Sequence, residues 1–386
     1  MARILIGWEL GAGDGHSTRQ LKLAQLLTER GHEPLFAPQQ IGPFAVHGPT
    51  WQAPVWPRLL GPLSRRYALP PATMGDMLAY LGLDDRQAMA AMIMAWDRVV
   101  ADARPDVVVA EYAPSLQMVV RGRVPCVAWG TGFSLPPADM PEFPSLSGEA
   151  AVVPETALLA GLNDALADAG RRPLAALPEV FAADRSIAAT FTELDPYRQW
   201  RCEPLSAPAV PESIPLAASD GAEVFVYFNT PARRPEALLQ ALVQSKLTLR
   251  IHDPLIDERA AAVLESKGIA VEREPVAFTQ IAARSRLVVS HGGLGFASSA
   301  LLAGLPQVVI PFDQEKRLTA EALVELGLCR QVDVQGLEAG ALVAVLRSAW
   351  DDDEFHARAR EAAPVFRERM EPSAEEAAAD VVEEFI

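Results

Sequence analysis

The residues with the clearest chemical potential form one short turn, His291-Gly292-Gly293-Leu294-Gly295. The turn follows the apolar segment 286–290 and precedes the apolar segment 296–303, so we expect it to join a strand to a helix. Glycines allow backbone N–H groups to approach a ligand closely, and a helix N-terminus carries partial positive charge. A histidine at the end of the strand can add a hydrogen bond to a phosphoryl oxygen. The turn therefore predicts a phosphate or diphosphate site, although close packing of a helix on a strand also selects glycine.

A second glycine-rich turn, residues 11–15, stands directly before His16. It follows the apolar segment 3–8 and precedes an amphipathic segment that extends to Gly31, where a helix would end. A neutral imidazole accepts protons near neutral pH because its ordinary pKa is about 6.5. We therefore expect one turn to hold a diphosphate and the other to present a base. His16 could instead cap the helix.

The elements that must position these turns alternate between strand and helix along the chain. Further strands are expected at 34–38, 105–112, 124–132, 222–229, 247–252, 269–272 and 306–311, and helices at 87–103, 235–246, 257–267, 278–284 and 315–326. Apolar strands separated by helices are typical of a parallel sheet. We predict an α/β protein of two Rossmann-like domains that face each other across a cleft, with ligands at the carboxyl ends of the strands.

A proline-rich stretch without periodicity, 196–222, indicates where the domains are joined. We predict an N-terminal domain over 1–205, a linker over 206–221 and a C-terminal domain over 222–370. A C-terminal helix within 371–386 could pack back on the N-terminal domain. Segment 39–75 is rich in proline, tryptophan and glycine and is expected to be a long irregular excursion.

Composition narrows the class of partner. Half of the 386 residues are hydrophobic and 22% are charged, which excludes disorder of the whole chain. The formal charge of −16 and the absence of a basic cluster argue against nucleic acid as a partner. The three cysteines lie far apart without metal-ligand spacing, which fits a cytoplasmic location. No apolar stretch reaches the about 18 residues that span a bilayer, so no transmembrane segment is expected and peripheral membrane contact stays open.

Both turns belong to longer motifs that resemble a known family. The strings HGGLGFASSALLAGLPQVVIPF at 291–312, LTAEALVELGL at 318–328 and GDGHSTRQLKLAQLLTERGHE at 13–33 are similar to motifs of bacterial GT-B glycosyltransferases of the UDP-glycosyltransferase type, family 1-like. The resemblance implies a metal-independent, inverting transfer of a sugar from a nucleotide-diphosphate donor, with no cofactor beyond that co-substrate. It says little about the substrates.

The resemblance assigns the candidate base and its partner. In this family the histidine that matches His16 deprotonates the acceptor, and an acidic residue at the end of a strand orients it. The matching acidic position is Glu111, where the family usually has aspartate. Glu111 could instead be an ordinary surface carboxylate.

The donor half matches the family at the glycine turn and departs from it nearby. Phe296 replaces the serine or threonine that adds a hydroxyl to the phosphate, and Ser299 replaces the glutamate that holds the ribose. By spacing, Phe278 falls where a residue contacts the nucleotide base. The carboxylate that binds the sugar matches Glu315 by register, with Asp313 as second choice.

Two further groups of residues complete the candidate site. Asn229 and Thr230 end a strand where the family has a turn that contacts the donor, so we include both as donor ligands. Phe44, Trp51 and Trp56 suggest an apolar or lipid-like acceptor, but they could equally pack in the core or a lid. Three other functions stay open: a nucleotide-sugar epimerase or hydrolase of the same architecture, a noncatalytic homologue that binds a nucleotide-sugar or assists a partner enzyme, and a structural or interaction protein.

Overall fold

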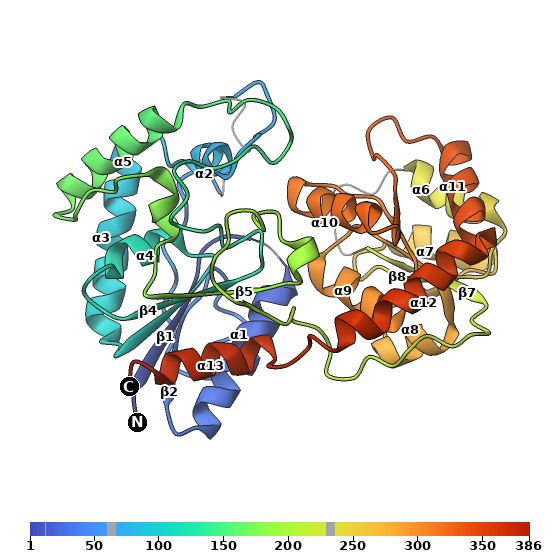
Figure 1. The fold of residues 1–386 in the computed structure, drawn as a ribbon, viewed down its shortest axis with the longest axis horizontal. Helices are drawn as coiled ribbons and strands as arrows, with labels where there is room; N and C mark the ends of the chain where they lie inside the picture. The colour runs from blue at the N-terminus through green and yellow to red at the C-terminus, as the bar shows by residue number, and fades with distance from the viewer. Residues whose placement is uncertain (12, 60–66, 229–235) are drawn as a thin grey trace. The chain divides into compact units, whose positions relative to one another are not determined.

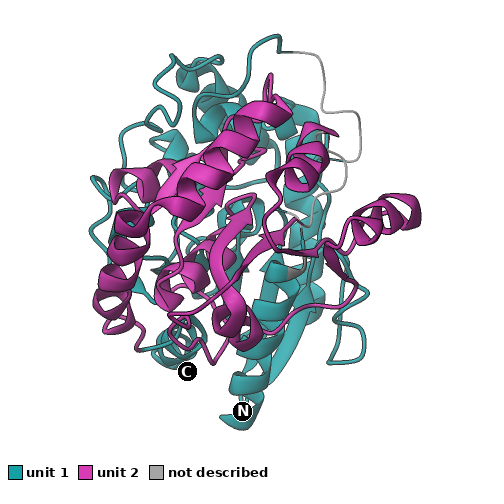
Figure 2. Cartoon of the chain, turned by 90° about the vertical axis from the view of Figure 1, so that its right-hand side faces the viewer, with its two compact units in different colours: residues 1–207, 372–386 teal, residues 208–371 magenta. Residues whose placement is uncertain are grey.

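The computed structural model describes residues 1–11, 13–59, 67–228 and 236–386 of the chain. Within these residues the protein is a mixture of helices with two six-stranded parallel sheets (Figure 1). The chain divides into two compact units (Figure 2). Unit 1 comprises Met1–Ala207 and Pro372–Ile386, and unit 2 comprises Pro208–Glu371. The predicted α/β class with two Rossmann-like parts is confirmed.

Unit 1 is built on a sheet with the strand order β2-β1-β3-β4-β5-β6. The strands are β1 (Arg3–Trp8), β2 (Glu33–Ala37), β3 (Val107–Glu111), β4 (Cys126–Gly130), β5 (Arg185–Ala189) and β6 (Leu205–Ser206). Every residue of β3 and β4 is buried, as expected where helices cover both faces of a parallel sheet. The register pairs Trp8 with Glu111 and Glu111 with Trp129, so the carboxyl ends of these strands meet at one edge.

The helices of unit 1 are α1 (Asp14–Glu29), α2 (Met74–Leu81), α3 (Arg86–Ala103), α4 (Pro114–Val120), α5 (Glu155–Asp168) and α13 (Ala374–Glu383), with short 3-10 turns at η1 (Leu177–Phe181) and η2 (Thr192–Leu194). The helices α2 and α4 were not expected from the sequence. Both are short, and all seven residues of α4 are buried, so α4 shows no polar face that a periodic pattern could reveal.

The C-terminal helix α13 lies in unit 1, where it contacts α1, β4 and β5 (Figure 1). Ser373 and Glu376 cap its first turn reciprocally. Its outer face is tied to the end of α1, because Arg30 pairs with Asp380 at 2.7 Å and with Glu383 at 2.9 Å.

Unit 2 has the strand order β12-β11-β10-β7-β8-β9. Its strands are β7 (Glu223–Tyr227), β8 (Leu249–His252), β9 (Ala270–Glu272), β10 (Ser285–Ser290), β11 (Gln307–Val309) and β12 (Cys329–Gln331). Its helices are α6 (Glu236–Ser245), α7 (Glu258–Ser266), α8 (Phe278–Arg284), α9 (Leu294–Ala303), α10 (Gln314–Glu325), α11 (Ala339–Asp351) and α12 (Asp353–Arg367).

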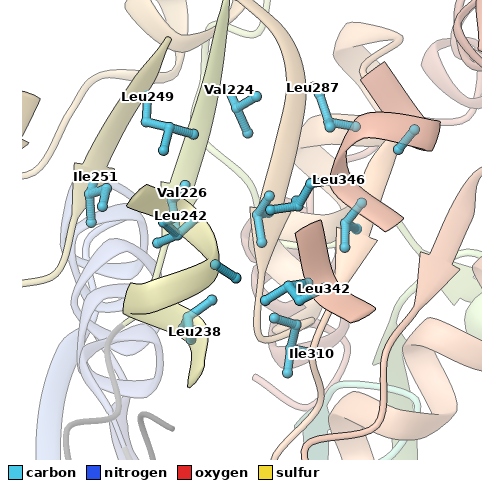
Figure 3. Close-up of a cluster of buried hydrophobic side chains, with 14 of the residues drawn as sticks. Val224, Val226, Leu238, Leu242, Leu249, Ile251, Leu287, Ile310, Leu342 and Leu346 are labelled. Carbon is cyan, nitrogen blue, oxygen red and sulfur yellow. The ribbon is translucent and has the colours of Figure 1, made fainter. Parts of the chain in front are cut away.

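The core of unit 2 forms where α6 and α11 pack on one face of this sheet (Figure 3). Leu238 and Leu242 of α6 meet Leu342 and Leu346 of α11 over apolar strand residues such as Val226, and all are buried. Burial of each such side chain contributes about 1.5–3 kcal/mol to stability. Leu287 and Val289 of β10, the strand that precedes the glycine turn, belong to the same cluster.

The chain passes from unit 1 to unit 2 between Ala207 and Pro208, so most of the expected linker belongs to unit 2. Within it, the backbone N–H groups of Ala217 and Ala218 donate to the carbonyls of Ala303 and Ala282. Among the helices of the described residues, we find none with the length and apolarity needed to cross a membrane.

Candidate functional site

The candidate base and its carboxylate come from neighbouring elements at the edge of the unit 1 sheet. Glu111 is the last residue of β3, and His16 stands in the first turn of α1. The Nδ1 atom of His16 lies 2.9 and 3.0 Å from the two oxygens of the fully buried Glu111 carboxylate. Helix α1 has Gly13 as its N-cap and no side-chain capping bond there, so His16 does not occupy the cap position.

The ring of His16 is held on two further sides. Trp8 stacks on it with the ring centroids 5.0 Å apart and the planes inclined by 14°. Gly11 has a φ of +89°, and a Cβ atom there would lie only 2.4 Å from Nε2 of His16. With Nδ1–H donating to the carboxylate, Nε2 carries the lone pair. The arrangement can therefore present one unprotonated ring nitrogen in a fixed direction.

Two more side chains of α1 bind the same carboxylate. The Nη2 atom of Arg19 donates to Oε1 of Glu111, and Nε2 of Gln20 donates to Oε2 at 3.2 Å. Burial by itself would raise the pKa of the Glu111 carboxyl, but the charges of His16 and Arg19 outweigh burial and lower it. Sequence reasoning missed Arg19 and Gln20. Their spacing of three and four residues from His16, which places them on one helix face, was the available signal.

A second buried carboxylate, Glu9, anchors the strand end that carries Trp8. It accepts hydrogen bonds from the hydroxyl of Ser115 at 2.6 Å, the N–H of Leu116 at 2.7 Å and the indole of Trp56 at 2.9 Å. Burial raises the pKa of Glu9 despite these bonds. Glu9, the residue after Trp8, thus links the end of β1 to the start of α4 and to Trp56 of the segment 39–75.

The three aromatic residues expected to bind an acceptor occupy different environments. Phe44 and Trp56 are fully buried, so their side chains pack in the core of unit 1. Trp51 is partly exposed, and its indole donates to Asp102 at 2.7 Å. Phe44 and Trp56 therefore fit the core alternative, and Trp51 alone keeps a surface that a ligand could touch.

The glycine turn of unit 2 joins β10 to α9 as expected. Gly292 has a φ of +88°, and a Cβ atom there would lie 2.7 Å from Cγ1 of Val309. The N-cap of α9 is Gly293, which offers no side-chain cap, and a Cβ atom at Gly295 would lie 3.2 Å from the carbonyl oxygen of Ala209, which is closer than an ordinary contact. The glycine turn thus leaves the backbone N–H groups at the start of α9 accessible, and the N-terminus of a helix stabilises an anion.

His291 stands in this turn as a neutral imidazole. Burial and the nearby charge of Lys316 lower its pKa to about 4. Its Nδ1 atom has no hydrogen-bond partner within the described parts of the chain. His291 is therefore able to form a hydrogen bond to a ligand without contributing a charge.

The two departures from the family pattern have structural explanations. Phe296 stacks on Tyr227 with the centroids 4.8 Å apart and meets the edge of Phe278 at 5.8 Å. Ser299 is buried, and its hydroxyl donates to the carbonyl of Gly295 at 2.7 Å. The Ser299 hydroxyl is consequently engaged within α9, as is common for serine inside helices.

The candidate sugar ligands are engaged with each other through Lys316. Asp313 caps α10 by accepting from the N–H of Lys316 at 3.0 Å, and Glu315 lies 2.6 Å from the Lys316 ammonium. The two carboxylates raise the pKa of Lys316 against the effect of burial, so this lysine is charged. Asn229 and Thr230 lie outside the described residues.

Part of the sequence matches glycosyltransferases. Residues 256–383 match the glycosyltransferase family 28 C-terminal domain. The NDP-glycosyltransferase YjiC of Bacillus subtilis is 31% identical over 88 residues, which are 23% of this chain and 22% of YjiC. The O-mycaminosyltylonolide 6-deoxyallosyltransferase of Streptomyces fradiae is 28% identical over 131 residues, 34% of this chain and 30% of that enzyme. The matched segments thus span less than a third of either relative.

The structural likeness extends over the whole chain. The calicheamicin glycosyltransferase CalG4 superposes with a TM-score of 0.73 at 19% identity and covers 100% of this chain and 98% of its own. The spinosyn rhamnosyltransferase SpnG, complexed with thymidine diphosphate, has a TM-score of 0.65 at 16% identity and covers 99% of this chain and 100% of its own. The chain therefore has the GT-B fold of these glycosyltransferases.

Proposed function

We propose that this protein is an inverting glycosyltransferase that moves a sugar from a nucleoside-diphosphate donor to the hydroxyl group of an acceptor. The observation that carries the proposal is the contact of His16 Nδ1 with both oxygens of Glu111, at 2.9 and 3.0 Å. This contact leaves Nε2 as the proton acceptor. The glycosyltransferase relatives in sequence and fold support the same reaction class.

The proposed chemistry is a single displacement. Nε2 of His16 takes the proton of the acceptor hydroxyl while the acceptor oxygen attacks the anomeric carbon. The bond between that carbon and the diphosphate oxygen breaks, and the electron pair leaves with the diphosphate. Glu111 holds the imidazole in the tautomer and orientation that leave Nε2 free to accept this proton. One displacement inverts the configuration at the anomeric carbon.

The leaving diphosphate is assigned to the glycine turn of unit 2. The first turn of α9, the close backbone approach at Gly292 and the neutral donor His291 would stabilise the growing negative charge. The mechanism gives this task to backbone N–H groups and an imidazole instead of a metal ion.

We also propose that the donor nucleoside lacks a ribose 2′-hydroxyl, as in a thymidine diphosphate sugar. The position at which the family binds the ribose hydroxyls with a carboxylate is Ser299, whose hydroxyl is bonded within α9. Solved relatives in complex with thymidine diphosphate support this choice. Isothermal titration should show tighter binding of thymidine diphosphate than of uridine or guanosine diphosphate, and equal affinities would contradict it.

The acceptor is proposed to be an apolar small molecule that bears a hydroxyl group. Two relatives are named for glycosylation of a macrolide and of calicheamicin, and Trp51 offers a partly exposed aromatic surface. The first assay should therefore offer thymidine diphosphoglucose as donor with a panel of apolar phenols and macrolides as acceptors, and measure transfer of the sugar.

The base assignment is tested by His16→Ala. This variant should lose transfer by at least about a hundredfold, since general bases contribute on that order, while nucleotide affinity stays unchanged. His47→Ala, which removes an exposed histidine, is the matched control. Transfer at the wild-type rate in the His16 variant would remove the proposed role.

One alternative function has an observation in its favour. Phe296 and Ser299 remove two family contacts to the donor, which is also what a noncatalytic nucleotide-sugar-binding homologue would show. Such a protein would bind a nucleoside diphosphate but release none from a nucleotide sugar, with or without acceptors. Release without any acceptor would instead indicate a hydrolase.

A further inference from the structure

The carboxylate of Glu111 is the meeting point of three side chains from one helix face. His16, Arg19 and Gln20 follow the helical spacing of three and four residues, and all three point to this single group. The Arg19 side chain is only 6% exposed and that of Glu111 is 0% exposed. A carboxylate and a guanidinium so well shielded from water interact strongly.

The Arg19 guanidinium is held in place by the neighbouring strand. Its central carbon lies 4.9 Å from the ring centroid of Trp129, the residue of β4 that pairs in register with Glu111. An aromatic face at this distance stabilises a cation. Arg19 is thus fixed between Trp129 and the carboxylate that also binds the base.

This arrangement changes the charge that His16 experiences. A buried carboxylate alone would strongly favour the protonated imidazole, which cannot accept a proton from a substrate. Among the described residues, the titratable or charged side chains that contact the Glu111 carboxylate are His16 and Arg19, both from α1, whereas Trp8 of β1 and Trp129 of β4, which pair with Glu111 in the sheet, carry no charge. With Arg19 present, the carboxylate and the guanidinium together are neutral.

We propose that Arg19 is a positioning residue for the base, which shares the charge of Glu111 so that this carboxylate orients His16 without trapping a proton on it. The inference rests on the proposed role of His16 as the base. Arg19 would thus act together with His16 and Glu111. Its positive charge explains how a fully buried carboxylate can lie beside an imidazole that must remain neutral.

The test is the proton titration of His16, followed by NMR on the full-length protein labelled with ¹³C at histidine Cε1. The His16→Gln variant identifies the resonance. In Arg19→Gln the titration midpoint of His16 should rise by about one pH unit, because the carboxylate charge is no longer shared. Arg19→Lys keeps the charge and should restore most of the wild-type midpoint. An unchanged midpoint in Arg19→Gln, or equal shifts in both variants, would overturn the proposal.

A double variant guards against loss of folding when Glu111 is left unpaired. Arg19→Gln with Glu111→Gln contains no unpaired buried charge, so it is expected to fold. If the two charges cancel in the wild type, the His16 midpoint of the double variant should stay within about half a pH unit of the wild-type value. A fall of one unit or more would mean that Glu111 acts on His16 with its full charge, which contradicts the proposal.

A matched control separates this effect from the general loss of an ion pair. Arg58→Gln breaks the shielded pair of Arg58 with Asp84, which is 2.7 Å long and has side chains 15% and 11% exposed. It should leave the His16 midpoint unchanged. The titration needs neither donor nor acceptor, so it can succeed or fail independently of the transferase assay.

Discussion

At the scale of single residues, the two histidines of the candidate site differ in how the protein holds them. His16 is oriented by a carboxylate and stacked on Trp8, whereas burial and the charge of Lys316 lower the pKa of His291. The first arrangement suits proton transfer and the second suits a neutral hydrogen bond to an anion. The same residue type therefore serves two proposed purposes because its surroundings differ.

The burial of His291 predicts a specific sensitivity to acid. Its pKa of about 4 in the folded protein lies below the about 6.5 of an exposed imidazole, so the unfolded chain binds more protons between these values. The contribution of His291 to the free energy of unfolding is fully present above about pH 6.5 and is lost as the pH falls toward 4. The total loss is about 3 kcal/mol once the pH lies below both pKa values. His291→Gln should lack this loss.

The measurement is the urea midpoint of unit 2 at pH 7 and pH 4.5, followed by hydrogen exchange of peptides from β10. The difference between the two pH values should be larger in the wild type than in His291→Gln. Identical acid sensitivity of both proteins would contradict the assigned state of His291.

How far the site could be predicted from the sequence also depends on particular residues. His16 and Glu111 were paired through their places in a family motif, and the structure brings them together. Arg19 occupies a motif position that the family pattern leaves undefined, so only the fold reveals its contact with Glu111. Phe44 and Trp56 were ambiguous because an apolar side chain suits a pocket and a core equally well.

At the scale of elements, β1 and α4 are joined by the carboxylate of Glu9. It receives hydrogen bonds from two backbone N–H groups at the start of α4, from the Ser115 hydroxyl and from the Trp56 indole. The strands were predictable because their apolar runs are continuous. The short helix α4 was not, because its position is set by this long-range contact.

The replacement Glu9→Gln should therefore destabilise unit 1. The glutamine amide keeps one accepting oxygen, but its NH2 group faces partners that are themselves hydrogen-bond donors. We therefore expect the free energy of unfolding to fall by about 3 kcal/mol. The melting temperature of unit 1, followed by tryptophan fluorescence, measures it. Glu149→Gln, a change at an exposed residue, is the control. Equal melting temperatures for the two variants would show that Glu9 is dispensable.

At the scale of the whole molecule, unit 1 is made from both ends of the chain. The apolar face of α13 is buried at Ala374, Ala378, Ala379 and Val382, whereas its ion pairs with Arg30 involve exposed carboxylates. Exposed ion pairs contribute about 0–1 kcal/mol, so the apolar face should supply most of the stability.

Two substitutions in α13 can compare the contributions of its apolar face and of its ion pairs to stability. Val382→Asp places a charge in the buried face and should lower the melting temperature of unit 1 strongly, with unit 2 unaffected. Asp380→Asn removes an exposed partner of Arg30 and should lower the free energy of unfolding of unit 1 by at most about 1 kcal/mol, so its melting temperature should change little. The assignment of α13 to unit 1 fails if Val382→Asp destabilises unit 2 instead.

The return of the chain to unit 1 after Glu371 has a consequence for biosynthesis. Unit 2 is continuous in sequence and can complete its packing as soon as it leaves the ribosome, whereas unit 1 must wait for its final helix. A nascent chain stalled so that only residues up to Glu371 have emerged should resist protease in unit 2 and be cleaved in unit 1. The unit that carries the proposed base thus begins to be translated before unit 2 and is completed after it.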